Sequence, residues 1–437
     1  MADVDFDSGS EAQGRAPGVY IKEVEPSPGA GFATGVPLFI GFARIRPQAI
    51  EDQGSNEPKS LRLASWEQFE QSIEFVAPGS FLGYAVRGFF ENGGERCFVV
   101  PLRLNDNQLE LMKHQLELDA EQSGKDVEET CRRILEDALE NFFRKDINEL
   151  RPVIPNIDDA DLVCVPDLMM KFIRAVPEMV YELQRRVLDY CKDMGERFAI
   201  LDMLPDETTD IKKSIRHWQA LVPAEGALYF PWVRVKSLNG SGEQWVPPCG
   251  HVAGIYARTD ARVGFHKAPA NEIVEGVLDL QSNITPEIQG KLNDAGVNCL
   301  RSFARRGIRV WGARTLSGHR NWRYVNVRRI FLTLNRWIEH NMNDLVFEPN
   351  GPALWDRVRD RLGGYCYELL ELGALKGRTP EEGYFVKCDA EINPLEVREA
   401  GQVICDVGLA PLSPAEFIVI RITRSAEGTT AVVPGTV

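Results

Sequence analysis

The runs DLVCV at residues 161–165 and RFAILDM at residues 197–203 enclose the stretch of sequence that decides the fold. Both are short apolar runs of the kind that forms buried strands, and residues 169–193 between them have the pattern of a helix. Further apolar runs that predict strands lie at residues 36–42, 96–102 and 226–232. Because strands and helices alternate, the sequence predicts an α/β fold with a mainly parallel sheet covered on both faces.

A part of different character begins near residue 285. It contains two amphipathic helices, at residues 326–340 and 353–372, and three strand candidates, at residues 384–388, 402–407 and 416–422. The last candidate is almost wholly apolar, which requires cover on both of its faces.

The opposite end of the chain carries an isolated strand candidate from Val19 to Val24. Proline and glycine residues between Pro26 and Gly35 separate this run from the main body. A strand of this kind cannot fold alone and must join a sheet elsewhere. The predicted units are therefore a disordered start at 1–16, an arm strand and tether at 17–34, an outer α/β domain at 35–284 with a charged helical excursion near 106–150, a C-terminal domain at 285–424, and a flexible tail at 425–437.

Composition restricts the class of protein. The chain has 437 residues, of which 44% are hydrophobic and 26% charged, as in an ordinary soluble globular protein. It has no apolar run long enough to span a membrane, and its acidic start does not resemble a secretion signal, so we expect synthesis and folding in a cytosol. The nine cysteines include no C-x-x-C spacing, and the closest pair in sequence is Cys388 and Cys405. We expect them to be reduced core residues rather than metal ligands.

The segment from Ala295 to Ile338 contains ten arginines and no acidic residue, within a chain whose net charge is -14. Segments of one sign often face a partner of opposite sign, and arginine suits paired or interface charges. Two other interpretations stay open. Some arginines pair with acidic residues of the same chain, or the interleaved Trp311, Trp322 and Tyr324 stack on nucleic acid.

Enzymatic chemistry has little support in the sequence. Asp167, Asp202 and Asp206 follow or end predicted strands and could form a Mg²⁺ site, although acidic residues at these positions also cap helices. Neither a phosphate-binding glycine loop nor a G-x-S-x-G motif is present, and His251 and His266 lack the spacing of metal ligands.

An ordered series of motifs resembles the contractile tail sheath protein family of phage tails and contractile injection systems. At the start these are PGVYIKEV at 17–24 and GVPLFIGFA at 35–43, with KAPANE at 267–272 in the middle. The C-terminal third matches densely, through GIRVWGARTL (307–316), WRYVNVRR (322–329), FEPN (347–350), LW (354–355), GAL (373–375), TPEE (379–382), FVKCD (385–389) and PAEF (414–417). The excursion at 106–150 matches least well.

The resemblance implies a structural subunit that forms sixfold rings stacked helically around an inner tube and contracts to drive the tube through a target envelope, without a cofactor or enzymatic activity. A contractile phage tail is the alternative to an injection system, and a metal- or nucleotide-dependent α/β enzyme is a more remote one. The implied partners are further copies of the chain, the tube protein, and baseplate and cap proteins, with no nucleic acid contacted directly and no membrane insertion. Assembly is implied in the bacterial cytoplasm, for a particle that is released, cytosolic or membrane-anchored.

The resemblance also implies site residues. The C-terminal domain becomes an α+β sheath core whose terminal strands are exchanged between subunits, by β-augmentation. The expected exchange residues are Val19, Tyr20, Ile21, Lys22, Val24, Val403, Ile404, Phe417, Ile418, Val419, Ile420 and Ile422. The residues expected to contact the inner tube are Arg328, Arg329, Arg336, Arg357 and Arg361.

Overall fold

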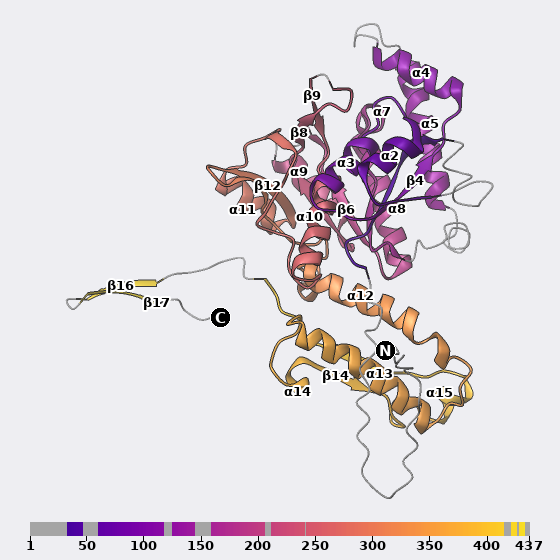
Figure 1. Ribbon diagram of the computed structural model, residues 1–437, viewed down its shortest axis with the longest axis vertical. Helices are drawn as coiled ribbons and strands as arrows, with labels where there is room; N and C mark the ends of the chain where they lie inside the picture. Colours follow the sequence, from indigo (N-terminus) through magenta and orange to yellow (C-terminus); the bar gives the residue numbers. More distant parts are fainter. Residues whose placement is uncertain are drawn as a thin grey trace, which may run out of the picture. The chain divides into compact units, whose positions relative to one another are not determined.

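The computed structural model describes residues 33–46, 60–117, 125–144, 159–205, 211–240, 242–414, 421–425 and 428–432. The chain divides into two compact units, Met1–Ala33 and Thr34–Val437, and the structure described here is that of the second (Figure 1). The predicted disordered start and the arm strand at 19–24 lie outside the described residues.

A ten-stranded mixed sheet forms the centre of the α/β part (Figure 1). Its strands are β1 (Pro37–Ile45), β2 (Leu61–Leu63), β3 (Ile73–Val76), β4 (Cys97–Leu102), β5 (Leu162–Cys164), β6 (Phe198–Asp202), β7 (Gly226–Phe230), β10 (Glu272–Ile273), β12 (Val297–Phe303) and β13 (Gly307–Val310). The order is β10-β13-β12-β7-β6-β5-β1-β4-β2, with β3 also paired to β1. The six strands from β12 to β4 are parallel neighbours, which confirms the predicted mainly parallel sheet.

The central strands of this sheet are buried on both faces, as their continuous apolar runs predict. Strand β6 is buried throughout and β1 almost throughout. The accompanying helical segments are α2 (Trp66–Ser72), α3 (Leu82–Glu91), η3 (Pro166–Met169), α7 (Lys171–Arg174), α8 (Pro177–Met194), α9 (Ile211–Leu221), α10 (Cys249–Arg262) and α11 (Pro286–Asp294). A separate three-stranded sheet has the order β11 (Val277–Leu280), β8 (Val233–Lys236), β9 (Glu243–Val246).

Two glycines allow α3 and α10 to approach each other closely. A Cβ atom on Gly250 would lie 2.2 Å from the carbonyl oxygen of Ala85, and one on Gly254 would lie 2.4 Å from that of Phe89. Any larger residue at these positions of α10 would therefore push the two helices apart.

The predicted charged excursion is helical. It contains α4 (Asp106–Glu117) and α5 (Lys125–Arg144), and α5 packs against α7 and α8. The apolar stripe of α5 is directed inward, with Cys131, Leu135 and Leu139 fully buried.

The C-terminal part begins later than the sequence predicts. Strands β12 and β13 belong to the large sheet, so that sheet continues across the boundary expected between residues 284 and 285. The elements that follow are η5 (Arg320–Trp322), α12 (Val325–Asn341), η6 (Asn343–Leu345), α13 (Pro352–Glu371), α14 (Pro380–Gly383), β14 (Tyr384–Lys387), α15 (Leu395–Glu399), β15 (Asp406–Leu409), β16 (Arg421–Ser425) and β17 (Gly428–Val432). Apolar periodicity alone did not reveal that two strands after residue 285 pair with the preceding sheet.

Candidate assembly site

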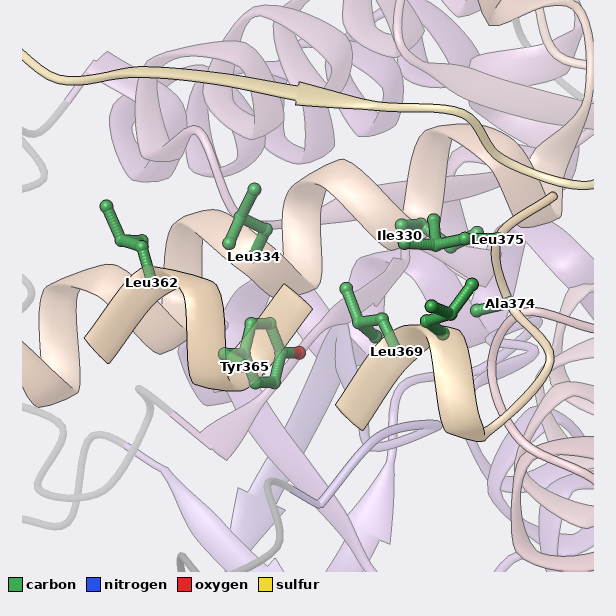
Figure 2. Packing of buried hydrophobic residues seen from close by; sticks show 8 residues of the cluster. Ile330, Leu334, Leu362, Tyr365, Leu369, Ala374 and Leu375 are labelled. Atoms are coloured by element: carbon green, nitrogen blue, oxygen red, sulfur yellow. The ribbon is translucent and has the colours of Figure 1, made fainter. Parts of the chain in front are cut away.

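Helices α12 and α13 share one buried apolar cluster. Their apolar residues recur every three or four positions, which places Ile330 and Leu334 on one face of α12 and Leu362, Tyr365 and Leu369 on one face of α13. Figure 2 shows these side chains together with Ala374 and Leu375, which follow α13. Burying a large apolar side chain contributes about 1.5–3 kcal/mol relative to exposure, so this cluster is a stable base for what packs on it.

A pair of short antiparallel strands, β14 and β15, packs on this base. The register pairs Tyr384 with Leu409, Phe385 with Gly408, Val386 with Val407 and Lys387 with Asp406. Tyr384, Val386, Val407 and Leu409 pack against the helix cluster. Phe385 points to the opposite face, where it is 60% exposed.

Among the described residues, β14 and β15 pair only with each other. Ala410 N donates to Gly383 O at 2.8 Å, which sets the phase of the antiparallel ladder. In that phase the backbone groups of Tyr384 and Val386 point to the outer edge of β14, and those of Val407 and Leu409 to the outer edge of β15. A two-stranded sheet with apolar residues on its inner face and two open edges is a template for added strands.

The predicted exchange residues Val403 and Ile404 are exposed but precede β15 instead of lying in a strand. The side-chain amide of Asn393 accepts from Ile404 N at 2.7 Å and donates to Ile404 O at 2.9 Å. The backbone of Ile404 is therefore occupied within its own chain, which corrects its assignment to intersubunit pairing. The sequence reveals no sign of this contact, because Asn393 lies in an irregular segment.

The remaining predicted exchange residues fall on or beside segments outside the described residues. Val19, Tyr20, Ile21, Lys22 and Val24 lie there, and so do Phe417, Ile418, Val419 and Ile420. Ile422 is described and belongs to β16, where it pairs with Ala431 of β17 in a hairpin of the same chain. The predicted flexible tail from residue 425 thus contains a strand.

The structure corrects the assignment of two arginines to the inner-tube surface. Arg329 is 2% exposed and its guanidinium lies between Asp161, at 2.9 Å, and Asp260, at 2.5 Å. Arg336 is 1% exposed and donates to the Asp159 carbonyl oxygen at 3.3 Å. Arginines buried in this way stabilise the packing of α12 and do not form a surface for a second protein.

The other three predicted tube residues differ in exposure. Arg328 is mostly covered, because it pairs with Glu225 at 2.5 Å and lies over the Trp322 ring. Arg357 and Arg361 are exposed on α13, where they pair with Glu348 and Asp344. The Asp344 pair holds the pKa of that carboxyl below its usual value and raises the pKa of Arg361, chiefly through the side-chain hydrogen bond.

Four further arginines of the acid-free segment gather at the hairpin of β12 and β13. Arg301 and Arg306 both lie over the Phe303 ring, and Arg309 donates to the Asn271 carbonyl oxygen at 2.6 Å. With Arg305 they form a basic surface, and none of the four makes an ion pair with an acidic side chain of the described residues. Pairing within the chain therefore accounts for Arg314, Arg328 and Arg329, whereas the four hairpin arginines form a basic group.

The carboxylates considered for a metal site are structural. Asp167 is fully buried and accepts from Phe42 N, Phe81 N and Ser80 Oγ. Asp202 accepts from Cys249 N at 2.8 Å, and Asp206 lies outside the described residues. Burial raises the pKa of Asp167 to about 6 and that of Asp202 to about 7. Within the described ranges, no three His, Cys, Asp or Glu side chains converge as metal ligands.

The two histidines are also structural. His251 is buried with its ring against Gly88, and His266 lies partly buried beside Gly264. Burial lowers the pKa of His251 to about 4. Across the helices that the structure describes, none combines the length and apolar character needed to cross a membrane.

The fold is that of contractile sheath proteins. The chain is similar to a chain of the anti-feeding prophage (AFP) baseplate, with a TM-score of 0.67 and 29% identity over 94% of this chain and 99% of that one. It is also similar to the PVC sheath complex of an extracellular contractile injection system in its contracted state, with a TM-score of 0.63 and 28% identity over 94% and 98% of the two chains. Because both matches cover nearly the whole length of each chain, they define the class of protein as contractile sheath proteins.

Family models place the chain within that class. The phage tail sheath protein central domain matches residues 159–316, and the phage tail sheath C-terminal domain matches residues 319–424. The chain belongs to the tail sheath protein family. The tail sheath protein of Salmonella phage ViI is 21% identical over 249 residues, which are 52% of this chain and 38% of that protein, so the match spans well under half of this relative.

Proposed function

We propose that this chain is the sheath subunit of a contractile injection system, polymerising as helically stacked sixfold rings around an inner tube. Whole-length similarity to the AFP and PVC chains supports an injection system over the alternative of a contractile phage tail, whose sheath proteins match over a smaller share of their length. The role is structural, since the carboxylates that an enzyme would use already accept hydrogen bonds from the backbone.

One observation carries the assembly part of this proposal: β14 and β15 lie over an apolar base, and no further strand of the described residues pairs at either outer edge. Strands of neighbouring copies, from residues 19–24 and 416–422, would add to these edges by β-augmentation. Each backbone hydrogen bond contributes roughly 0.5–1.5 kcal/mol net, so two short strands hold neighbours together. Because main-chain pairing does not depend on the angle between bodies, the mesh survives contraction.

The tube contact is proposed for the face of α13 that carries Arg357 and Arg361. Both side chains are exposed, and Phe347, in the turn before α13, is fully exposed. An exposed large aromatic side chain beside two arginines is typical of a protein–protein contact. Exposed ion pairs contribute little individually, which suits contacts that must release together on contraction.

The further partners in this proposal are a baseplate and a cap protein at the two ends of the polymer. Assembly would take place in the bacterial cytoplasm, followed by release, cytosolic retention or membrane anchoring of the finished particle. Neither direct nucleic-acid binding nor membrane insertion is part of the proposed role.

Electron microscopy of the full-length chain, expressed with its tube and baseplate proteins, tests the proposal. We expect hollow cylinders with sixfold end views, and loss of these cylinders when residues 1–24 are deleted. A second deletion that removes residues 1–16 only is the control, and it should still assemble because it keeps the arm strand. Monomers from the full-length chain, or cylinders from the 1–24 deletion, would contradict the proposal.

A further inference from the structure

Two cysteines lie directly across from each other at the end of the two-stranded sheet of β14 and β15, the assembly sheet of the proposed function. The last paired residues of β14 and β15 are Lys387 and Asp406, and the next residues outward are Cys388 and Cys405. They are seventeen positions apart in sequence, which is outside any C-x-x-C spacing. The register therefore reveals a proximity that sequence spacing conceals.

The phase of the ladder makes this pair suitable for a covalent bond. Lys387 and Asp406 belong to the hydrogen-bonded set that includes Gly383 and Ala410, so Cys388 and Cys405 face each other at a non-hydrogen-bonded position. The Cα atoms of such a pair are about 4.5 Å apart, within the range of about 4.4–6.8 Å that disulfides span. Each thiol shifts the pKa of the other, as expected of neighbouring sulfur atoms, and Cys388 Sγ lies 3.5 Å from the Ile404 carbonyl oxygen.

Accessibility distinguishes this pair from another pair of neighbouring cysteines. Cys164 Sγ lies 4.0 Å from the Cys249 carbonyl oxygen, but both residues are fully buried, Cys164 in β5 and Cys249 at the start of α10. Cys405 is only partly buried, whereas Cys388 is 1% exposed. A small oxidant can therefore reach Cys405 without unfolding the chain.

We propose that Cys388 and Cys405 are a redox modification site that forms an intrachain disulfide when the protein meets a small-molecule disulfide such as oxidised glutathione. The Cys405 thiolate attacks one sulfur of that molecule, forming a mixed disulfide and releasing one small thiolate. The Cys388 thiolate then attacks Cys405 Sγ, which forms the protein disulfide and releases the second small thiolate. Both cysteine thiols lose their protons, the two small thiolates accept them, and the two electrons reduce the small disulfide.

The surroundings of the two thiols set the rate and order of these steps. Burial, together with the neighbouring Cys388, Asp406 and Cys366, raises the pKa of the Cys405 thiol to about 12, so the first step should accelerate as the pH rises. Burial and Asp389 also raise the pKa of Cys388, but Cys405, Arg359 and Asn393 act in the opposite direction, so no value near that of Cys405 is reached. Cys388 is therefore the better resolving nucleophile.

The bond would join the ends of the two strands whose edges, under the proposed function, receive strands from neighbouring copies. A closed loop removes conformational freedom from the unfolded chain, so the oxidised form should unfold at a higher temperature. Only the effect of the disulfide on assembly rests on the proposed function. The disulfide itself concerns a single chain.

Thiol mapping of the purified full-length chain tests the proposal. The reduced protein is incubated with oxidised glutathione at pH 8.5, quenched in acid, alkylated under denaturing conditions, and analysed by intact mass and peptide mapping. We expect a product that has lost two hydrogens, alkylates two fewer thiols than the nine in the sequence, and links the peptides of Cys388 and Cys405.

Three serine variants make the result specific. Cys388→Ser should stop at the mixed disulfide on Cys405, and Cys405→Ser should form neither product at this site. Cys366→Ser, which removes the nearest other thiol, should form the Cys388–Cys405 link as the natural chain does. An oxidised natural chain that keeps nine free thiols, stops at a mixed disulfide, or links Cys366 instead would overturn the proposal. Because the measurement uses unassembled chain, failure of the proposed assembly leaves its outcome unaffected.

Discussion

The Arg329 guanidinium donates to Asp161 Oδ2 at 2.9 Å, and the same Asp161 carboxylate accepts the backbone N–H groups of Gly35 and Val36. Arg329 belongs to α12, whereas Gly35 and Val36 immediately precede β1, the first strand of the large sheet. One buried carboxylate therefore joins α12 to the residues that precede the first strand of the sheet. In the proposed sheath, this contact would connect the arm to the domain that carries the assembly sheet.

Replacing Arg329 by methionine should strongly destabilise the chain. The change leaves Asp161 and Asp260 buried without their cation, and breaking a buried ion pair costs about 3–5 kcal/mol. Urea unfolding of the unassembled chain measures the loss. Arg359→Met, which removes an exposed arginine from α13, is the control and should leave the unfolding midpoint unchanged. Equal urea midpoints for both variants would show that Arg329 does not join α12 to Asp161 and Asp260.

Replacing Gly250 by alanine should separate two helices that touch through it. The new Cβ would lie 2.2 Å from the Ala85 carbonyl oxygen, and such overpacking costs about 1–3 kcal/mol. Thermal unfolding should show the loss. Gly290→Ala in α11 is the matched control, because nothing lies within 4 Å of its new Cβ and alanine favours a helix by about 1 kcal/mol. The contact is unimportant if the two variants shift the midpoint in the same direction.

The pKa of Asp202 predicts a pH dependence of stability. Burial raises this pKa from 3.8 to about 7, so the folded state holds the proton more tightly than the unfolded state. The stabilisation is therefore complete below pH about 4 and is lost as the pH rises through about 7, with a slope of at most ~1.4 kcal/mol per pH unit.

Asp202→Asn should flatten that slope, because asparagine can still accept from Cys249 N but does not ionise. The free energy of unfolding is measured in urea from pH 4.5 to 8. Asp167, whose pKa is raised to about 6, retains part of the slope in this variant. Asp294→Asn, at a highly exposed carboxylate, should change nothing. A slope in Asp202→Asn as steep as in the natural chain would contradict the assignment.

Replacing Val386 by proline should block assembly while the single chain stays folded. The backbone N–H of Val386 points to the open edge of β14, so proline removes a donor that only an added strand would use. Electron microscopy should show no cylinders, and circular dichroism should be unchanged. Val386→Thr keeps both the N–H group and the β-branched shape and should assemble. Cylinders formed by the proline variant would exclude strand addition at this edge.

Charge reversal on α13 should distinguish the side of the helix that is proposed to face the tube from the opposite side. Arg357 and Arg361 are four residues apart and share one face, whereas Arg359 lies about 200° from Arg357 around the helix. We expect Arg357→Glu with Arg361→Glu to yield mostly empty or unassembled sheaths, counted in micrographs. Arg359→Glu should yield tube-filled sheaths in the natural proportion. If both variants lose the tube to the same extent, the contact does not belong to this face.

The sequence predicted those elements whose pattern is local. Apolar runs such as DLVCV and RFAILDM, alternating with helices, were sufficient for a mainly parallel sheet, because burial on both faces demands continuous apolar residues. The apolar periodicity of α12 and α13 likewise predicted both helices and the face of each that enters their shared cluster, but not that Arg329 and Arg336 of α12 are also buried. Motif order predicted the family, which the family models confirm.

Only the tertiary structure decided which charged and polar groups meet. Arg329 lies 168 residues from Asp161 and 69 from Asp260, so no spacing could distinguish this buried arginine from the exposed Arg357. The same holds for two other contacts. Asn393 hydrogen-bonds to the backbone of Ile404, and the strand register places Cys388 opposite Cys405. Hydrophobic periodicity records which side of an element avoids water, whereas a specific ion pair, hydrogen bond or thiol contact arises only where packing brings distant segments together. For this reason the sequence by itself determined the strands and helices that form the layers of this protein. Only the folded structure decided which charged, polar and thiol groups contact each other.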